Sequence, residues 1–139
     1  MPLLAIRWIN FLIMSRLKNF FSKRIRSFGY AFKGIWWFFS SQVNARIHLL
    51  AVVLLVALGT WMHISTTEWA ILFVCMGIVI TTEALNTAIE WIIDLVSPEY
   101  HPLAGKVKDV SAGAVLLSVL FCAAAWAFIF IPKFASMWP

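Results

Sequence analysis

The sequence predicts an all-α integral membrane protein with three transmembrane helices and an amphipathic surface helix before them. Composition is the first reason, because 63% of the 139 residues are hydrophobic and only 12% are charged. Soluble domains carry about 45–50% apolar and about 25% charged residues. Three apolar runs, residues 47–63, 69–93 and 112–131, are the second reason. Each is close to the about 20 residues that cross a bilayer.

The length allows one domain, which we divide into four segments. Residues 1–19 are an N-terminal extension, 20–46 the surface helix and the approach to the first span, 47–132 the three-span core, and 133–139 a tail. The surface helix is predicted from an apolar stripe at alternating steps of four and three, interleaved with basic residues, which is typical of a helix lying in the membrane interface. The apolar stripe consists of Phe21, Ile25, Phe28, Phe32, Ile35 and Phe39. An alternative is that this helix does no more than anchor the protein in the membrane.

The distribution of Lys and Arg predicts the orientation in the membrane. Eight of the eleven precede the first span, two lie between residues 94 and 109, and only Lys133 follows the third span. The positive-inside rule therefore places the N-terminus and the 94–109 loop in the cytoplasm, and the C-terminus and the 63–68 link outside. Pro98, Pro102 and Gly105 are expected to interrupt the helix within the 94–109 loop. The net charge of +5 is attributed to topology and anionic headgroups, not to a nucleic-acid partner.

The middle span carries the strongest functional signal. Its polar residues Glu83, Asn86 and Glu90, together with Asp94 just after it, fall within an arc of about 80° on one helix face. A carboxylate facing lipid costs about 2.5–3.5 kcal/mol or more near the bilayer centre. The stripe is therefore expected to face protein, a bound cation or a water-filled cleft.

The depth of these acids suggests different tasks. Glu90, near the cytoplasmic surface, is suited to hold Mg²⁺ together with phosphates. Glu83 lies about 10 Å deeper, where a desolvated carboxylate could take a proton from a hydroxyl. Asn86 could orient either partner, and Lys108 could reach phosphate oxygens from the second loop. Neither GxxxxGK[ST] nor GxGxxG occurs, so a nucleotide site here would be of another type.

Other interpretations of the same residues remain open. The polar stripe could instead hold an oligomer together by interhelical hydrogen bonds. A small oligomeric ion-coupled transporter could use Glu83 as an intramembrane proton site. A holin-like or scaffold protein would leave the stripe unexplained. His101, beside Pro102, could be an ordinary turn residue, and Lys108 could be ordinary positive-inside charge.

Several motifs together resemble the prokaryotic diacylglycerol kinase family, which includes undecaprenol kinases. They are Glu83 to Glu90 (EALNTAIE), Asp94, Glu99-Tyr100-His101, Lys108-Asp109 and Ala112 to Val115, and the likeness extends from about Phe20 to Phe130. Residues 44–50 look more like the undecaprenol-kinase branch. The resemblance implies a homotrimer in the cytoplasmic (inner) membrane. It further implies transfer of the γ-phosphoryl group of MgATP to a lipid hydroxyl at the cytoplasmic interface.

The resemblance also implies roles for individual residues. Glu83 would be the catalytic base and Asn86 its partner, Glu90 a metal ligand, and Glu83 and Asp94 contacts to the lipid substrate. The nucleotide would be bound by Lys23, Tyr30, Glu90, Glu99, His101, Lys108 and Asp109. Two positions depart from the family pattern. Lys23 stands where Arg is usual, and Gln42 stands where a second metal-binding Glu is usual, so that Gln42 could offer Mg²⁺ an amide oxygen but no charge. No residue distinguishes diacylglycerol from undecaprenol as substrate.

Overall fold

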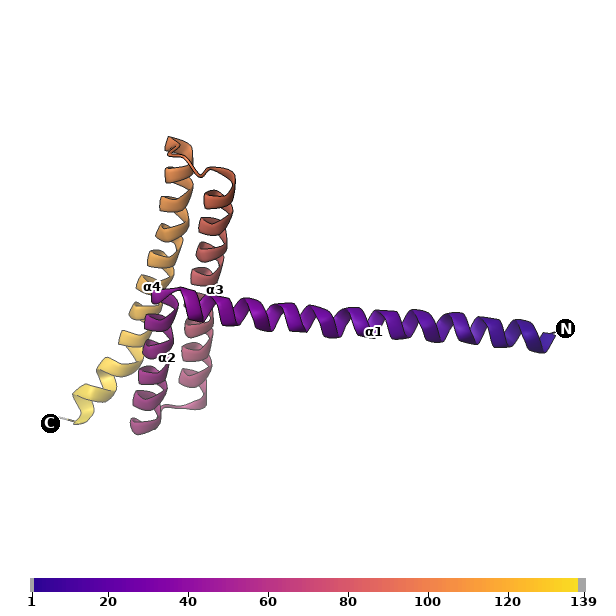
Figure 1. Cartoon of the computed structure of the whole chain (residues 1–139). Helices are drawn as coiled ribbons and strands as arrows, with labels where there is room; N and C mark the ends of the chain where they lie inside the picture. The colour runs from indigo at the N-terminus through magenta and orange to yellow at the C-terminus, as the bar shows by residue number, and fades with distance from the viewer. Residues whose placement is uncertain (1, 138–139) are drawn as a thin grey trace. The chain divides into compact units, whose positions relative to one another are not determined.

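The computed structural model describes the backbone of residues 2–137 and the side chains of residues 14, 16 and 18–137. Four helices account for most of this part and no strand occurs within it, which confirms the all-α prediction. They are α1 (Pro2–Ser41), α2 (Val43–Trp61), α3 (Thr66–Val96) and α4 (Pro102–Met137) (Figure 1). The chain divides into two compact units, Met1–Ser40 and Ser41–Pro139. The Arg7 side chain and the last two residues of the predicted tail lie outside the described residues.

The first unit is α1, which is longer than predicted. The 1–19 extension and the surface helix form one helix from Pro2 onward. Its apolar stripe is exposed, with Ile25 and Phe32 at 71% and 70%, as a helix that rests on a membrane surface requires. The Arg24 guanidinium lies over the Phe20 ring, 5.0 Å from its centroid.

The helix of the predicted 20–46 segment stops before residue 46, and the first span begins within that segment. The helix ends at Ser41, because Gln42 adopts an extended backbone with φ −99° and ψ 124°. The first span then begins at Val43, four residues earlier than predicted, with Gln42 as its N-cap residue. The Gln42 side chain makes no capping hydrogen bond.

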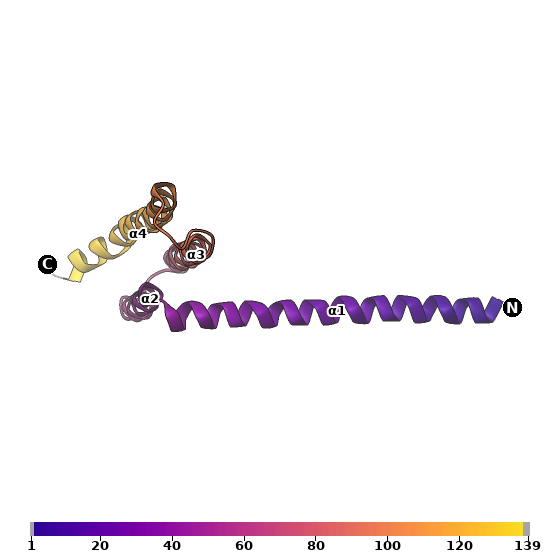
Figure 2. The ribbon, with the colours of Figure 1, turned by 45° about the horizontal axis from the view of Figure 1, so that its top comes forward.

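The second unit is a bundle of three helices, α2, α3 and α4, each long and apolar enough to cross a membrane. At about 1.5 Å per residue, the 19 residues of α2 match a hydrocarbon core of about 30 Å, while the 31 residues of α3 exceed it by about half. The hairpin formed by α3 and α4 accordingly projects beyond α2 at the top of Figure 1. α3 packs against α4 and, over a shorter stretch, against α2 (Figure 2).

The turn between α2 and α3 is fixed by local hydrogen bonds and close packing. The Ser65 N–H donates to Glu68 Oε2 at 2.6 Å, and the Glu68 N–H donates to Ser65 Oγ at 3.3 Å, which is a capping box. Glu68 also pairs with Lys133 of α4 at 3.2 Å. Gly59 allows close approach here, since a Cβ at this position would lie 2.9 Å from Ile64 Cδ1.

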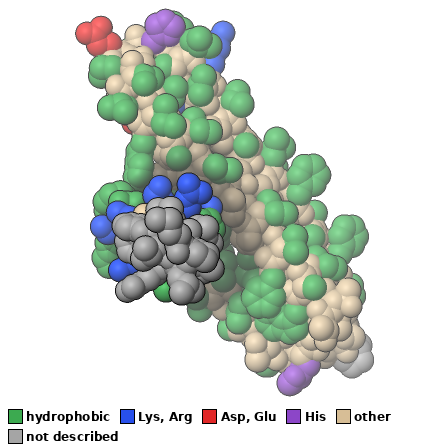
Figure 3. Space-filling view, turned by 90° about the vertical axis from the view of Figure 1, so that its right-hand side faces the viewer, with side chains coloured by type: hydrophobic (Ala, Val, Ile, Leu, Met, Phe, Trp, Pro, Cys, Tyr) green, Lys and Arg blue, Asp and Glu red, His purple; other side chains and the backbone are tan. Residues whose placement is uncertain are grey.

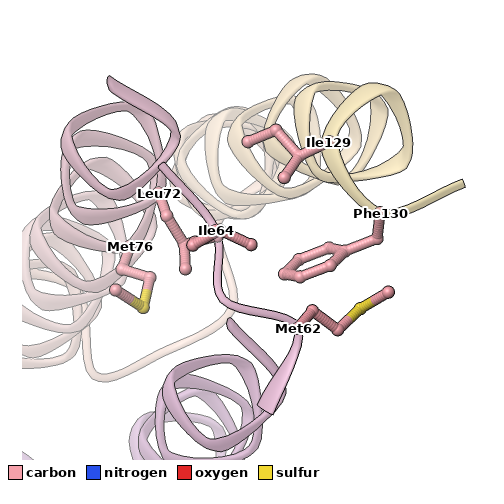
Figure 4. Close-up of a cluster of buried hydrophobic side chains, with 6 residues drawn as sticks. All are labelled: Met62, Ile64, Leu72, Met76, Ile129 and Phe130. Atoms are coloured by element: carbon pink, nitrogen blue, oxygen red, sulfur yellow. The ribbon is translucent and has the colours of Figure 1, made fainter. Parts of the chain in front are cut away.

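The apolar core of the bundle lies beside this turn. It contains Met62, Ile64, Leu72, Met76, Ile129 and Phe130 (Figure 4). A second cluster of Cys75, Val79 and Cys122 continues it along the contact between α3 and α4. The buried face of α3 is therefore apolar from Leu72 to Val79.

The prediction of a loop from residue 94 to 109 is wrong. α3 continues to Val96 and α4 begins at Pro102, so only residues 97–101 are non-helical. Proline is well tolerated in the first turn of a helix, where its missing N–H has no intrahelical partner, so Pro102 starts a helix instead of breaking one. Lys106, Lys108 and Asp109 consequently project from a helix, and the predicted third span lies within α4, which extends from Pro102 through Met137.

Large apolar side chains cover much of the outside of the bundle, including Leu54, Phe73, Phe121 and Phe128 at 59–84% exposure. Figure 3 shows hydrophobic side chains along the length of the bundle, with acidic side chains toward one end and histidine side chains at both ends. A surface of this kind requires lipid as its solvent. The chain is therefore an integral membrane protein, as predicted.

Candidate functional site

The buried face of α3 changes from apolar to polar halfway along the helix. After Val79 the next buried residues on this face are Glu83, Asn86 and Thr87, with exposures of 2%, 6% and 3%. The spacing of three and four residues from Leu72 onward keeps them on one side of the helix. The polar stripe is thus turned into the protein and away from the acyl chains.

Three side chains at the end of this stripe nearer the α3–α4 turn form a connected set of hydrogen bonds. Ser111 Oγ, on α4, donates to Asn86 Oδ1 at 2.6 Å. Asn86 Nδ2 in turn donates to Glu90 Oε1 at 3.0 Å, one turn further along α3. Asn86 therefore connects the α4 hydroxyl to a half-buried carboxylate, and the amide is held at both ends.

Glu83 has no such support. Its carboxyl group is nearly inaccessible, yet it makes no hydrogen bond within the residues that the structure describes. One turn away, the Thr87 hydroxyl oxygen is also buried without a partner in the described chain. Buried polar groups are normally hydrogen-bonded. Thr87 Oγ1 is an exception to this rule, as is Trp126 Nε1 on α4, and Thr87 lies one turn from a carboxyl group that also makes no described hydrogen bond.

A second cluster of polar residues lies where α3 meets α4. Lys108 Nζ pairs with Asp94 Oδ1 at 2.5 Å, and both side chains are substantially exposed. A pocket of about 210 Å³ adjoins this pair, and it is lined by Ile93, Asp94, Ser97, Pro98, Glu99, Tyr100, His101, Ala104, Gly105 and Lys108. Four residues predicted for the site from sequence therefore line one pocket: Asp94, Glu99, His101 and Lys108.

His101 also has a structural task in this pocket. Its Nδ1 accepts a hydrogen bond from the Leu103 N–H at 3.2 Å, and so satisfies one of the free N–H groups at the start of α4. His101 is therefore a turn residue, as one interpretation of the sequence held, and Nδ1 is the atom that serves in the turn. That bond leaves the other ring nitrogen, Nε2, for a ligand.

The remaining predicted residues are not among those that line this pocket. Lys23 and Tyr30 lie on α1 and are exposed. Asp109 is exposed on α4, one residue after the Lys108 of the pocket. Gln42 caps α2 through its backbone, and its side chain makes no hydrogen bond within the described part of the chain.

The donor set suits Mg²⁺ better than a metal held by protein alone. Within the described residues, no group of three or more His, Cys, Asp or Glu side chains could enclose a metal ion. Glu90 is half-buried, and its Oε1 is already oriented by Asn86, which leaves Oε2 available. Mg²⁺ is commonly bound by one or two carboxylates plus substrate phosphates and water. A single oriented carboxylate, one helical turn before the Asp94 that lines the polar pocket, fits this pattern.

One residue of the site, Ser111, was not found from sequence. It is buried beside the stripe, but serine is common in membrane helices, so it did not stand out. The position of Ser111, three residues after Lys108 and so on the same side of α4, was the only available signal. The pairing of Lys108 with Asp94 was likewise not anticipated, because each had been assigned a ligand.

Comparison with known proteins agrees with this architecture. Residues 29–130 match the family described as prokaryotic diacylglycerol kinase. The chain is 34% identical over 116 residues to an undecaprenol kinase of Bacillus subtilis, an alignment covering 84% of this chain and 94% of that protein. It is 30% identical over 106 residues to a diacylglycerol kinase of Escherichia coli K12, covering 76% and 87%. A diacylglycerol kinase of Synechocystis is 35% identical over 112 residues, covering 80% of this chain and 64% of that protein.

The match covers all three spans and the polar stripe, and it begins within α1. On this evidence the chain belongs to the prokaryotic diacylglycerol kinase family, and it is a lipid kinase.

Proposed function

We propose that this enzyme transfers the γ-phosphoryl group of MgATP to the hydroxyl of a membrane lipid, either diacylglycerol or undecaprenol, at the cytoplasmic interface. The observation that carries the proposal is the buried stripe on α3. It combines a partnerless carboxyl group, Glu83, with a hydrogen-bonded one, Glu90, at the two ends of about 10 Å of helix. A lipid hydroxyl and a nucleotide need two such environments, one dry and one at the water boundary.

Glu83 acts as the catalytic base in this proposal. Since no described group hydrogen-bonds to its carboxylate, the carboxylate is free to accept the proton of an incoming alcohol. The exposed apolar sides of α3 and α4 let the lipid approach from the bilayer. Asn86 holds Glu90 in place by its hydrogen bond to the Glu90 carboxylate. Asp94 contacts the lipid substrate when its carboxylate is not paired with Lys108.

Phosphoryl transfer depends mostly on positioning and charge neutralisation. When bound, Mg²⁺ neutralises phosphate charge, and Glu90 is the residue that would hold it, with Gln42 as a further oxygen donor. Lys108 offsets phosphate charge once a nucleotide competes with Asp94 for its ammonium group. Glu99, His101 and Asp109 complete the nucleotide site from the α3–α4 end, while Lys23 and Tyr30 contribute from α1.

The proposed setting is the cytoplasmic membrane. The N-terminus and the 97–101 turn face the cytoplasm and the C-terminus faces outward, as the distribution of Lys and Arg predicts. We further propose a homotrimer. The many exposed apolar side chains and the partnerless Glu83 and Thr87 are consistent with a second copy completing the site.

The test is a phosphorylation assay with radiolabelled ATP. Purified protein in mixed micelles is offered a panel of lipid alcohols, including diacylglycerol and undecaprenol, with Mg²⁺ and with EDTA. Labelled lipid that forms only with Mg²⁺ supports the proposal, and the preferred alcohol identifies the substrate. If reconstituted protein moved protons across vesicles and labelled no lipid, the ion-coupled transporter would be the better interpretation.

A further inference from the structure

We propose that Ser111 is a positioning residue that fixes the orientation of the Asn86 amide and, through it, the carboxylate of Glu90. This inference rests on the proposed function, because it takes Glu90 as the residue that holds the metal of the metal–nucleotide complex. It concerns a residue of α4 that does not itself touch a ligand.

The chemistry of the two hydrogen bonds sets the direction of the amide. An ionised Glu90 carboxylate can only accept, so the end of Asn86 that lies 3.0 Å from Oε1 must be its NH₂ group. The amide oxygen then points at Ser111 Oγ, 2.6 Å away, and requires a donor there. The hydroxyl of Ser111 is the donor that α4 supplies.

The proton of Ser111 has one competing acceptor. Its Oγ also lies 2.9 Å from the backbone carbonyl oxygen of Lys108, the usual partner of a helical serine. A hydroxyl has one proton, so the shorter contact to Asn86 takes it at the expense of the bond within α4. The side chain is 7% exposed, so water is a poor substitute for either partner.

Removing the Ser111 hydroxyl would leave the Asn86 amide oxygen without its hydrogen-bond donor. With alanine at position 111, the Asn86 oxygen is buried and unpaired, and the amide is held only by its bond to Glu90. The amide can then turn about its side-chain torsions toward another donor, which weakens its bond to Glu90. Glu90 would lose its orientation and bind the metal less well, although the fold and the rest of the nucleotide pocket remain.

The experiment measures binding, not turnover. The full chain in detergent is titrated with a preformed complex of Mn²⁺ and a non-hydrolysable ATP analogue, followed by electron paramagnetic resonance. The metal-free analogue in EDTA is titrated in parallel by calorimetry. Ser111→Ala should weaken binding of the metal complex about tenfold, the low end of the range for residues that support metal ligands. Binding of the metal-free analogue should change less than about twofold.

Matched variants separate positioning from general damage to the fold. Ser118→Ala is the control, because this half-buried serine of α4 donates only to the Val115 carbonyl oxygen, at 2.7 Å, and should bind both forms normally. Ser111→Thr keeps the hydroxyl and should retain most of the affinity. Ser111→Cys, with a similar volume and a weaker donor, replaces Ser111→Ala if the alanine variant does not fold, and the affinity should again fall.

A double-mutant cycle tests whether Ser111 acts through Asn86. In an Asn86→Ala background, Ser111→Ala should weaken the metal complex by less than about a further twofold. The inference is overturned if Ser111→Ala binds the metal complex like the native chain, loses both forms equally, or costs the same with Asn86 absent. A native chain that binds neither form of the nucleotide would instead overturn the proposed function.

Discussion

Replacing Glu83 by glutamine should separate activity from stability. The substitution keeps the size and shape of the side chain but removes a group that is 2% exposed and hydrogen-bonded to nothing in the described chain. A base that removes a proton in the transition state typically contributes about 10²–10⁴-fold in rate, or roughly 2.7–5.4 kcal/mol. Turnover should therefore fall by at least about a hundredfold.

The same substitution should not weaken the fold. A buried polar group without a partner costs about 1–3 kcal/mol, and more when it is charged. A neutral amide of the same volume removes the charged part of that cost. We therefore expect the thermal unfolding midpoint of Glu83→Gln in detergent to equal or exceed that of the native protein, while its phosphorylation of lipid collapses.

Glu68→Gln is the matched control, because it makes the same chemical change at the other end of α3. Glu68 is fully engaged by the Ser65 cap and the 3.2 Å pair with Lys133. Loss of this ion pair should change the unfolding midpoint little and leave turnover within about twofold. Turnover of Glu83→Gln within about threefold of the native enzyme would refute the assignment of Glu83 as base. An unfolding midpoint well below the native value would show that Glu83 has a stabilising partner, for example in a second copy of the chain.

Three further predictions follow from other parts of the bundle. Lys108→Met should raise KM for MgATP about tenfold with little change in thermal stability, because the exposed pair with Asp94 contributes at most about 1 kcal/mol. Asp94→Asn frees the Lys108 ammonium group and should not raise KM, and steady-state kinetics on both variants would decide. Gly59→Ala should destabilise the bundle by about 1–3 kcal/mol, since the added Cβ would lie 2.9 Å from Ile64 and 3.0 Å from Trp69; an unchanged melting curve would contradict this. Chelation of divalent ions by EDTA should abolish lipid phosphorylation in a way that Mg²⁺ restores and Ca²⁺ does not, because Ca²⁺ prefers more and longer oxygen contacts than one carboxylate and a nucleotide provide; full activity in EDTA would exclude the role given to Glu90.

The sequence determined which solvent each part of the chain requires. Apolar runs of membrane length specify spanning helices, because the free energy of burying apolar surface in lipid depends on length and composition and needs no partner. The same reasoning placed Glu83, Asn86 and Glu90 on one helix face, since helical geometry fixes the direction of each side chain from its position in the sequence. Both conclusions depend on local properties, and the structure agrees with them.

Boundaries and partners were decided by tertiary structure. Pro102 was interpreted as a helix breaker, but a proline that starts a helix and one that ends it have the same local signature, and α4 begins there. Ser111 shows the limit most clearly: its 25-residue separation from Asn86 is bridged only because α3 and α4 pack side by side, and nothing in the local sequence encodes that contact. The sequence by itself determined that an acidic stripe faces inward. Only the packing of α4 brought Ser111 to the Asn86 amide that holds Glu90, because hydrogen bonds between helices depend on distances that no periodicity contains.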